Sequence, residues 1–282
     1  MRTVLTVAGS DSGAGAGVQA DLKAISANGG YGLSVVTSIT AQNTKAVTTS
    51  FALPASLIEA QFDTLFDDFP IHATKSGMLA DRERVEVVAA CMRRYRPPHY
   101  VLDPVMVSTS GFPLLEEDAV DALRSELLPL ATLATPNIYE AQLLAGMSIR
   151  SVHDAIEAGR RILDLGPEAV IVKGGHLEQS PATDVLVRAD GQEVIEGEHL
   201  ESRNTHGTGC TFSAAIATQL ACGRELGEAI RVAKRYLTEA IRYGPAIGAG
   251  SRPTDHFFYL RHAATAGDPA HWLAPEGMEA GR

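Results

Sequence analysis

Short apolar runs rich in β-branched residues alternate with amphipathic helical patterns along almost the whole chain, and this alternation is what most limits its fold. Val4–Ala8 has the character of a buried strand, and Val18, Leu22 and Ile25 then recur at helical spacing. The same succession continues as far as Ala169–Lys173. It predicts an α/β fold with a mostly parallel central sheet covered by helices on both faces.

A hairpin signal and a change in composition mark the second half of the chain. The dipeptide Asp190–Gly191 separates two β-rich segments, which predicts antiparallel strands at Asp184–Arg188 and Glu193–His199. No internal repeat or flexible linker divides the sequence, so we expect one domain over residues 1–262. Residues 263–282, rich in Ala, Gly, Pro and Glu, are expected to form a loosely held tail.

The composition argues against several classes of protein. A formal net charge of −10 over 282 residues disfavours a nucleic-acid partner, because phosphate backbones are bound by basic faces. No apolar stretch approaches the roughly 20 residues that span a bilayer. The cysteines Cys91, Cys210 and Cys222 are too widely spaced for a disulfide framework or a zinc site. We therefore expect a cytoplasmic protein without nucleic-acid or membrane partners.

Several polar residues directly follow predicted strands. In open α/β sheets, ligands bind beyond the carboxyl ends of the strands, where such residues would gather. Each of them taken alone has an ordinary explanation as a solvated loop residue, and only their shared edge favours a site. The residues are Asp11, Gln42, Asn43, Asp103, Asn137 and Lys173.

The segment Asn204–Thr211, N-T-H-G-T-G-C-T, is the strongest single motif. It is a glycine-rich turn that leads into an amphipathic helix, and such a turn presents free backbone N–H groups to an anion. The alternative is an ordinary loop in which Thr208 caps the helix. Neither a Walker A pattern nor a G-x-G-x-x-G pattern occurs, which disfavours P-loop NTPases and Rossmann dehydrogenases.

Cys210 lies at the start of the same helix, and its role has two interpretations. A helix N-terminus lowers a thiol pKa, which would favour a reactive thiolate. A small apolar side chain packed under the helix would explain the cysteine equally well. The sequence around Cys210 is compatible with both interpretations.

Eight motifs occur in the order found in one known family. The sequence resembles the hydroxymethylpyrimidine/phosphomethylpyrimidine kinases of thiamine biosynthesis, which belong to the ribokinase-like superfamily, from about Thr3 to Phe257. The motifs are A-G-S-D at Ala8–Asp11, G-A-G-V-Q-A-D at Gly15–Asp21, I-T-A-Q-N-T at Ile39–Thr44, S-G-M-L at Ser76–Leu79, D-P-V-M-V at Asp103–Val107, T-P-N at Thr135–Asn137, V-K-G-G-H at Val172–His176 and the Asn204–Thr211 segment.

The resemblance implies a ribokinase-like three-layer α/β/α sandwich and an ATP-dependent, Mg²⁺-dependent kinase. The implied substrates are 4-amino-5-hydroxymethyl-2-methylpyrimidine and then its monophosphate. A homodimer is also implied, since family members often dimerise. The implied pyrimidine pocket consists of Gly9, Asp21, Gln42, Met78 and Val107.

The same resemblance assigns the phosphate-transfer end of the site. It implies that Asp103 and Glu140 reach Mg²⁺, that Gly207 and Gly209 form an anion hole, and that Cys210 is the catalytic base. Lys173 would stabilise the charge of the transferring phosphoryl group. The implied nucleotide-binding residues are Asn137, Glu140, Lys173, Thr205 and Thr208.

Two other functions compete with this interpretation. Pyridoxal or pyridoxine kinase activity is the nearer alternative, because the superfamily phosphorylates similar rings, although Gln42 favours an aminopyrimidine. A non-catalytic pyrimidine sensor is the more distant one. It would have no need of the phosphate-binding residues Asp103, Glu140 and Lys173.

Overall fold

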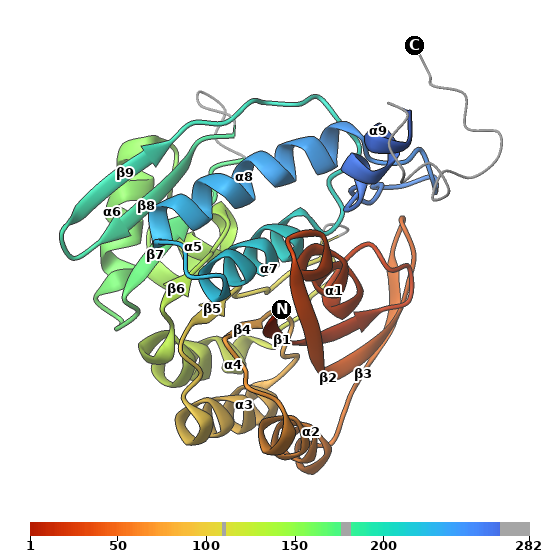
Figure 1. Ribbon diagram of the computed structural model, residues 1–282. Coiled ribbons are helices and arrows are strands. Elements are labelled where there is room, and N and C mark those ends of the chain that lie inside the picture. Colours follow the sequence, from red (N-terminus) through yellow and green to blue (C-terminus); the bar gives the residue numbers. More distant parts are fainter. Residues whose placement is uncertain (109–110, 176–181, 266–282) are drawn as a thin grey trace.

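A nine-stranded sheet organises the computed structural model, which describes residues 1–108, 111–175 and 182–265 (Figure 1). The strand order is β3-β2-β1-β4-β5-β6-β7-β8-β9, and the six strands from β2 to β7 in this order are parallel. β3 pairs antiparallel with β2, and β8 and β9 add an antiparallel hairpin at the opposite edge. The strands are β1 (Arg2–Asp11), β2 (Gly30–Gln42), β3 (Val47–Ala52), β4 (Ala73–Ser76), β5 (Tyr100–Leu102), β6 (Leu133–Ala134), β7 (Ala169–Val172), β8 (Asp184–Arg188) and β9 (Gly191–Ile195).

Helices cover both faces of the sheet, as the strand–helix alternation predicts (Figure 1). One layer contains α1, α7 and α8, and the other contains α2 to α6. A π-helical turn at Leu123–Leu127 and a 3-10 turn at Leu128–Leu130 continue α4. The helices are α1 (Gly17–Ala27), α2 (Ala55–Asp68), α3 (Arg82–Tyr95), α4 (Glu117–Ala122), α5 (Ile138–Ala145), α6 (Val152–Leu163), α7 (Thr208–Ala221), α8 (Leu226–Arg242) and α9 (Phe258–Thr265).

Alternate side chains of each strand enter the two apolar cores, because successive residues of a strand point to opposite faces. Val4 belongs to the core beneath α1 and α7, whereas Leu5 and Val7 belong to the core on the other face. In β7, Ile171 and Val172 divide in the same way. The result is the three-layer α/β/α sandwich that the sequence predicts.

The structure differs from the sequence prediction mainly at the ends of elements. Strand β3 was not predicted, because the Val47–Ala52 run is mostly exposed and its polar residues weaken the strand pattern. The predicted hairpin is confirmed, although its second strand runs over Gly191–Ile195 and not over Glu193–His199. Helix α9 continues past residue 262 to Thr265, so the predicted boundary of the domain falls within a helix. The predicted tail otherwise lies outside the described residues.

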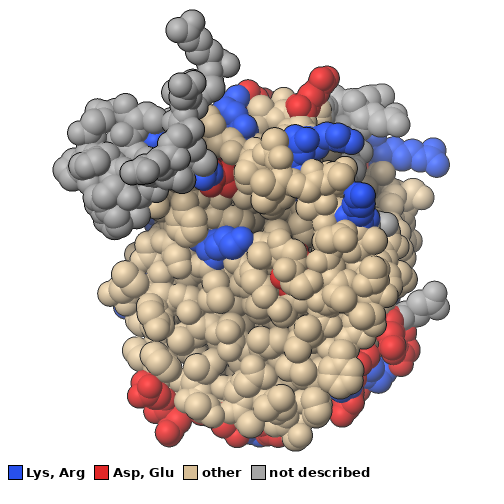
Figure 2. Space-filling model, turned by 90° about the vertical axis from the view of Figure 1, so that its right-hand side faces the viewer, with Lys and Arg blue, Asp and Glu red and all other residues tan. Residues whose placement is uncertain are grey.

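One face of the molecule carries few charged side chains. It is the face on the β2–β3 side of Figure 1, and Figure 2 shows it with acidic and basic groups concentrated near its rim. Tyr31 and Ile39 of β2 are each 51% exposed, and Phe51 of β3 is 67% exposed. Ile39 and Phe51 are cross-strand partners, so they present one apolar pair to solvent.

Among the described helices, none combines the length and apolarity needed to cross a membrane.

Candidate active site

The polar residues predicted at strand ends gather at one edge of the sheet. β1 ends at Asp11 and β2 ends at Gln42, while Asp103 directly follows β5. Asn137 and Lys173 form a parallel bridge just beyond β6 and β7. The shared edge is therefore confirmed, and the start of α7 lies against it: helix α7 contacts β1, β4 and β5.

The turn before α7 requires a glycine at position 207. Gly207 is the N-cap of the helix and has a φ of 77°, and a Cβ atom there would lie 1.9 Å from the carbonyl oxygen of Gly15. The alternative in which Thr208 caps the helix is wrong, because Thr208 is the first helical residue and its hydroxyl donates to Thr205 O at 3.1 Å. Thr211 N–H donates to Gly207 O at 2.9 Å.

The start of α7 faces a lysine and a carboxylate. The N–H groups of Gly209 and Cys210 precede the Thr211 bond, in the part of a helix where backbone donors have no intrahelical partner. A Cβ atom on Gly209 would lie 3.3 Å from Lys173 Nζ and 3.6 Å from Asp103 Oδ2. Backbone donors, the helix dipole and an ammonium group thus converge, which is an arrangement that suits a phosphate.

Lys173 is held beside the helix start by Asp103. Its Nζ donates to Asp103 Oδ1 at 2.8 Å, and the hydroxyls of Thr135 and Ser213 donate to the same carboxylate at 3.1 and 3.3 Å. Burial works against the charged form of Asp103, but the cations of Lys173 and Lys75 outweigh it and lower the pKa of this carboxyl. Asp103 is therefore a buried carboxylate that is ionised at neutral pH.

Glu140 is the second buried carboxyl of this region. It forms a capping box at the start of α5, in which Asn137 N–H donates to Glu140 Oε2 at 2.7 Å and Glu140 N–H donates to Asn137 Oδ1 at 2.9 Å. Burial raises the pKa of Glu140 to about 7, although the Lys173 cation opposes the shift. Asp103 adds to it through repulsion between the two carboxylates.

This carboxyl pair has the chemistry of a magnesium site. Mg²⁺ is usually bound by one or two carboxylates together with phosphate oxygens and water, so a larger protein cage is not required. Among the described residues, no group of three or more His, Cys, Asp or Glu side chains could hold a metal by itself. A cation beside Glu140 would favour its ionised form. Asp103 and Glu140 therefore fit an ion that is shared with a bound nucleotide.

The Cys210 thiol is partly buried, and the N–H of Gly17 faces its sulfur. Burial raises the pKa of this thiol to about 11, although the Lys75 cation pulls it down. The carboxylates of Asp21 and Asp103 raise it further. The pKa of the Cys210 thiol is therefore raised and not lowered as expected, because burial and the neighbouring carboxylates outweigh the lysine.

A fully buried ion pair lies close enough to Cys210 to affect its charge. Lys75 Nζ donates to both oxygens of Asp21 at 3.0 and 2.9 Å, Thr6 donates to the same carboxylate at 2.5 Å, and neither charged side chain has any exposed surface. Asp21 thus has bonds inside the protein, and its assignment to the pyrimidine pocket stays a prediction. Sequence analysis missed Lys75, although a lysine within a buried strand signals the need for a carboxylate partner.

Asp11 organises the loop between β1 and α1. Its carboxylate accepts the N–H groups of Gly13, Gly15 and Ala16 at 2.7, 3.1 and 2.9 Å, and His206 Nε2 lies 2.9 Å from it. Burial opposes the charge of Asp11, but these hydrogen bonds outweigh it and lower the pKa of the carboxyl. The backbone donors of this glycine-rich loop are therefore used within the loop.

Two of the predicted pyrimidine residues, Gly9 and Met78, are in contact with each other, and Gln42 contacts other residues. Gly9 lies against Met78, since a Cβ atom on Gly9 would lie 2.9 Å from Met78 Sδ. Gln42 accepts a hydrogen bond from the Thr40 hydroxyl at 3.0 Å, and its Nε2 lies 3.5 Å from His206 Nε2. His206 belongs to the Asn204–Thr211 motif, and its contacts with Asp11 and Gln42 were not predicted from the sequence.

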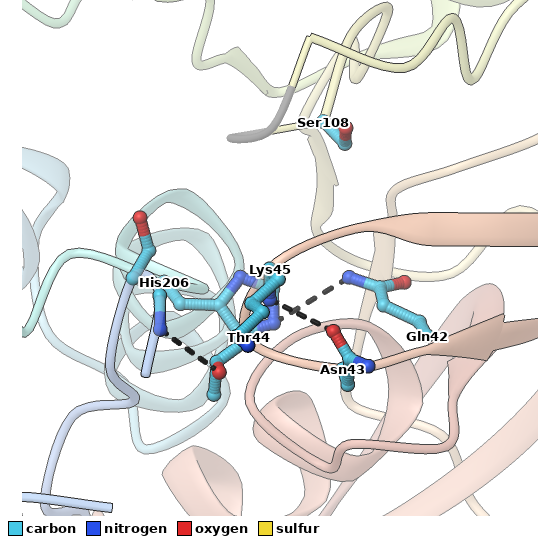
Figure 3. Close-up of a pocket in the computed structure, with 8 residues that line it drawn as sticks. Gln42, Asn43, Thr44, Lys45, Ser108 and His206 are labelled. Carbon is cyan, nitrogen blue, oxygen red and sulfur yellow. Dashed lines mark hydrogen bonds between the residues drawn. The ribbon is translucent and has the colours of Figure 1, made fainter. Parts of the chain in front are cut away.

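A cavity of about 330 Å³ opens beside Gln42 (Figure 3). Figure 3 shows Ser108 across the open space from Gln42 and Lys45, with His206 on the remaining side. Val107 precedes Ser108, and an isolated bridge pairs it with Pro113. The lining residues are Gln42, Asn43, Thr44, Lys45, Ser108, His206, Gly250 and Ser251.

Thr205 and His176 add little to the description of the site. Thr205 is exposed, and its carbonyl accepts the Thr208 hydroxyl. His176, the last residue of the V-K-G-G-H motif, lies outside the described residues.

A family model described as phosphomethylpyrimidine kinase matches residues 11–255. A hydroxymethylpyrimidine/phosphomethylpyrimidine kinase of Rhizobium meliloti is 48% identical over 258 residues, which cover 90% of this chain and 96% of that protein. The thiamine biosynthesis bifunctional protein ThiED of Geobacter sulfurreducens is 46% identical over 254 residues. The match covers 90% of this chain and 52% of that protein, so the chain spans about half the length of this relative.

Solved structures agree with this comparison. The phosphomethylpyrimidine kinase of Clostridium difficile superposes with a TM-score of 0.78 at 44% identity, covering 86% of this chain and 100% of that one. The pyridoxal kinase of Bacillus subtilis, solved as an ADP complex, gives a TM-score of 0.85 at 39% identity. It covers 91% of this chain and 97% of that one.

Proposed function

The chain belongs to the phosphomethylpyrimidine kinase family, and we propose that it transfers phosphoryl groups from ATP to a hydroxymethylpyrimidine in two steps. The first acceptor is 4-amino-5-hydroxymethyl-2-methylpyrimidine and the second is its monophosphate, so that the product is the diphosphate used in thiamine biosynthesis. The observation that carries the proposal is the close approach of Gly209, at the start of α7, to Lys173 and Asp103. This arrangement would provide a positively charged site for a phosphate next to buried carboxylates.

The phosphate end of the site would bind the γ-phosphoryl group. The N–H groups of Gly209 and Cys210 would donate to its oxygens, and Gly207 would keep the turn open for this approach. Lys173 would balance the negative charge that spreads over these oxygens during transfer. Asn137, Glu140, Thr205 and Thr208 would border the rest of the nucleotide.

Asp103 and Glu140 would hold Mg²⁺, in part through water. When bound, the ion supplies charge neutralisation for the phosphate groups. Lys173 already lies 2.8 Å from Asp103, so the same carboxylate would keep the lysine and the ion next to the nucleotide.

The pyrimidine would lie between Cys210 and the Gln42 cavity. Gln42 offers both a donor and an acceptor, which matches the edge of an aminopyrimidine ring. Met78 and Val107 would contact the faces of the ring, and Gly9 would leave room for it. Asp21 would lie at the bottom of this pocket, with its carboxylate held by Lys75.

Cys210 would accept the proton of the substrate hydroxyl in the first step. Because the thiol pKa is about 11, the reactive thiolate is a small fraction at neutral pH and increases as the pH rises. The acceptor oxygen of the monophosphate is already ionised at neutral pH, so the second step requires no base.

We further propose a homodimer formed through the charge-poor face on β2 and β3. Phe51 of β3 is 67% exposed and lies opposite Ile39 in the antiparallel pair. A second copy would cover this apolar pair, and an isologous contact needs no opposite charge on its partner. Sedimentation should give a dimer for the unchanged protein and a monomer for Phe51→Asp. A monomeric unchanged protein, or a Phe51→Asp dimer, would contradict this proposal.

A coupled assay of ADP release tests the catalytic proposal. The purified protein with Mg-ATP is supplied separately with the pyrimidine alcohol, its monophosphate, pyridoxal and ribose. Turnover of both pyrimidines in preference to the other two supports the function. Preference for pyridoxal would assign the chain to pyridoxal kinase activity instead, and tight pyrimidine binding without turnover would indicate a sensor.

A further inference from the structure

The backbone that carries Lys173 is held on both sides of this residue. On one side, Lys173 N–H donates to Pro136 O at 2.9 Å, which joins the ends of β6 and β7. On the other, Gly174 N–H donates to Asp184 Oδ1 at 3.0 Å. Asp184 is the first residue of β8, so a side chain ten positions along the chain fixes the peptide that follows the lysine.

Asp184 is itself held by a lysine from helix α8. Lys234 Nζ donates to Asp184 Oδ2 at 2.5 Å and to Ala182 O at 2.7 Å. The two side chains are only 10% and 12% exposed. A Cβ atom on Gly197 would lie 2.3 Å from Lys234 Cε, so the segment after β9 packs closely over the lysine chain. The pair is therefore a built part of the interior and not a surface contact.

The restraint matters because of the residues that follow Lys173. Gly174 and Gly175 have no side chains to fix their backbone, and glycine has more conformational freedom than any other residue. A hydrogen bond to an ionised carboxylate is about twice as strong as one between neutral groups. The Asp184 carboxylate thus supplies a strong anchor at the point where the chain is intrinsically loosest.

We propose that Asp184, oriented by Lys234, is a positioning residue for Lys173, and that it keeps the ammonium group beside Asp103 and the start of α7. This inference rests on the proposed role of Lys173 in phosphoryl transfer. Neither Asp184 nor Lys234 touches the reacting groups in this account. Their effect passes through the backbone of Gly174 to the lysine.

A double-mutant cycle with Lys173→Met tests the proposal, with single-turnover transfer from labelled ATP as the readout. Asp184→Ala should lower kcat/KM for ATP about tenfold to a hundredfold, because a misplaced charge-stabilising group loses most of its effect. Asp184→Asn, which keeps an acceptor for Gly174, should lose less. In the Lys173→Met background, Asp184→Ala should cause almost no further loss, since the residue that it positions is already absent.

The exposed ion pair between Arg231 of α8 and Glu193 of β9 provides a matched control. Arg231 Nη1 lies 2.7 Å from Glu193 Oε1, so this pair also joins α8 to the β8–β9 hairpin. Arg231→Met should leave phosphoryl transfer unchanged. If Asp184→Ala does not fold, Lys234→Met replaces it in the cycle, with the same non-additivity expected.

An equal loss from Asp184→Ala with and without Lys173 would overturn the proposal, because the residue would then act independently of the lysine. If Asp184→Ala retains full activity while Lys173→Met is strongly impaired, only the positioning role would be overturned. Full activity of Lys173→Met would overturn both this inference and the proposed role of the lysine.

Discussion

Replacement of Cys210 by alanine should slow phosphoryl transfer to the pyrimidine alcohol much more than transfer to its monophosphate. The alcohol must lose a proton during transfer, whereas the phosphate acceptor is already ionised at neutral pH. The thiol pKa is raised from 9.0 to about 11, so about one thiol in ten thousand is ionised at pH 7. Any transfer that depends on the thiolate is therefore limited by this small fraction.

The magnitude of the effect follows from the same pKa. Below it, the thiolate fraction grows about tenfold for each pH unit, so the first step should accelerate about a hundredfold between pH 8 and pH 10. Glu140, with a pKa of about 7, is largely ionised throughout this window and adds little to the slope. At the upper end, Cys210→Ala should cost about 10²- to 10⁴-fold in the first step, which is the usual contribution of a positioned base.

The assay is a rapid-quench single turnover with enzyme in excess over labelled ATP, run separately on the alcohol and on the monophosphate. Cys222→Ala is the control, because Cys222 is exposed at the other end of α7. Equal losses for the two acceptors in Cys210→Ala, or a first step in the unchanged protein that is independent of pH, would refute the assignment of Cys210 as the base.

Three further predictions concern stability. In urea denaturation, Gly207→Ala should lower the free energy of unfolding more than Gly223→Ala. Both glycines have positive φ, but only at position 207 would the new Cβ atom meet backbone atoms. Equal losses of stability would contradict this prediction. Lys75→Met should lower the free energy of unfolding by about 3–5 kcal/mol in the same measurement, because the buried Asp21 carboxyl loses its partner, and a loss below 1 kcal/mol, roughly that of an exposed pair, would contradict the description of this pair. Glu140 has a folded-state pKa raised from 4.5 to about 7, so its contribution to the free energy of unfolding is present below pH 4.5 and lost as the pH rises to about 7; Glu140→Gln should remove this slope, and an unchanged pH profile would contradict the shift.

Local sequence signals were sufficient for most of the fold. The Asp190–Gly191 dipeptide predicts the hairpin, because such dipeptides are typical of tight turns, although the two residues between the strands are Ala189 and Asp190. Strand β3 was missed because its partly exposed residues have neither a regular alternation nor a buried apolar run. Its place at the edge of the sheet depends on pairing with β2, which a local pattern does not encode.

The site was predictable where chemistry is concentrated in one motif, and less so where it depends on burial. The sequence predicts that Gly209 and Lys173 share a phosphate site, and the structure places the two residues together, while their binding of phosphate stays a proposal. The raised pKa of Cys210 could not be predicted from the sequence, because it comes from burial and from carboxylates that are distant in sequence. Lys75 and Asp184 were overlooked for the same reason, since their partners Asp21 and Lys234 are 54 and 50 positions away.

Phosphoryl transfer at the start of α7 beside Lys173 is the central step of the proposed mechanism. ³¹P NMR of the purified protein with Mg-ATP and the pyrimidine alcohol tests this most directly. We expect loss of the γ-phosphate signal, with a monophosphate ester appearing first and a diphosphate afterwards, and both products should form far more slowly with Lys173→Met. Release of inorganic phosphate alone, or equal product formation by the variant, would contradict it.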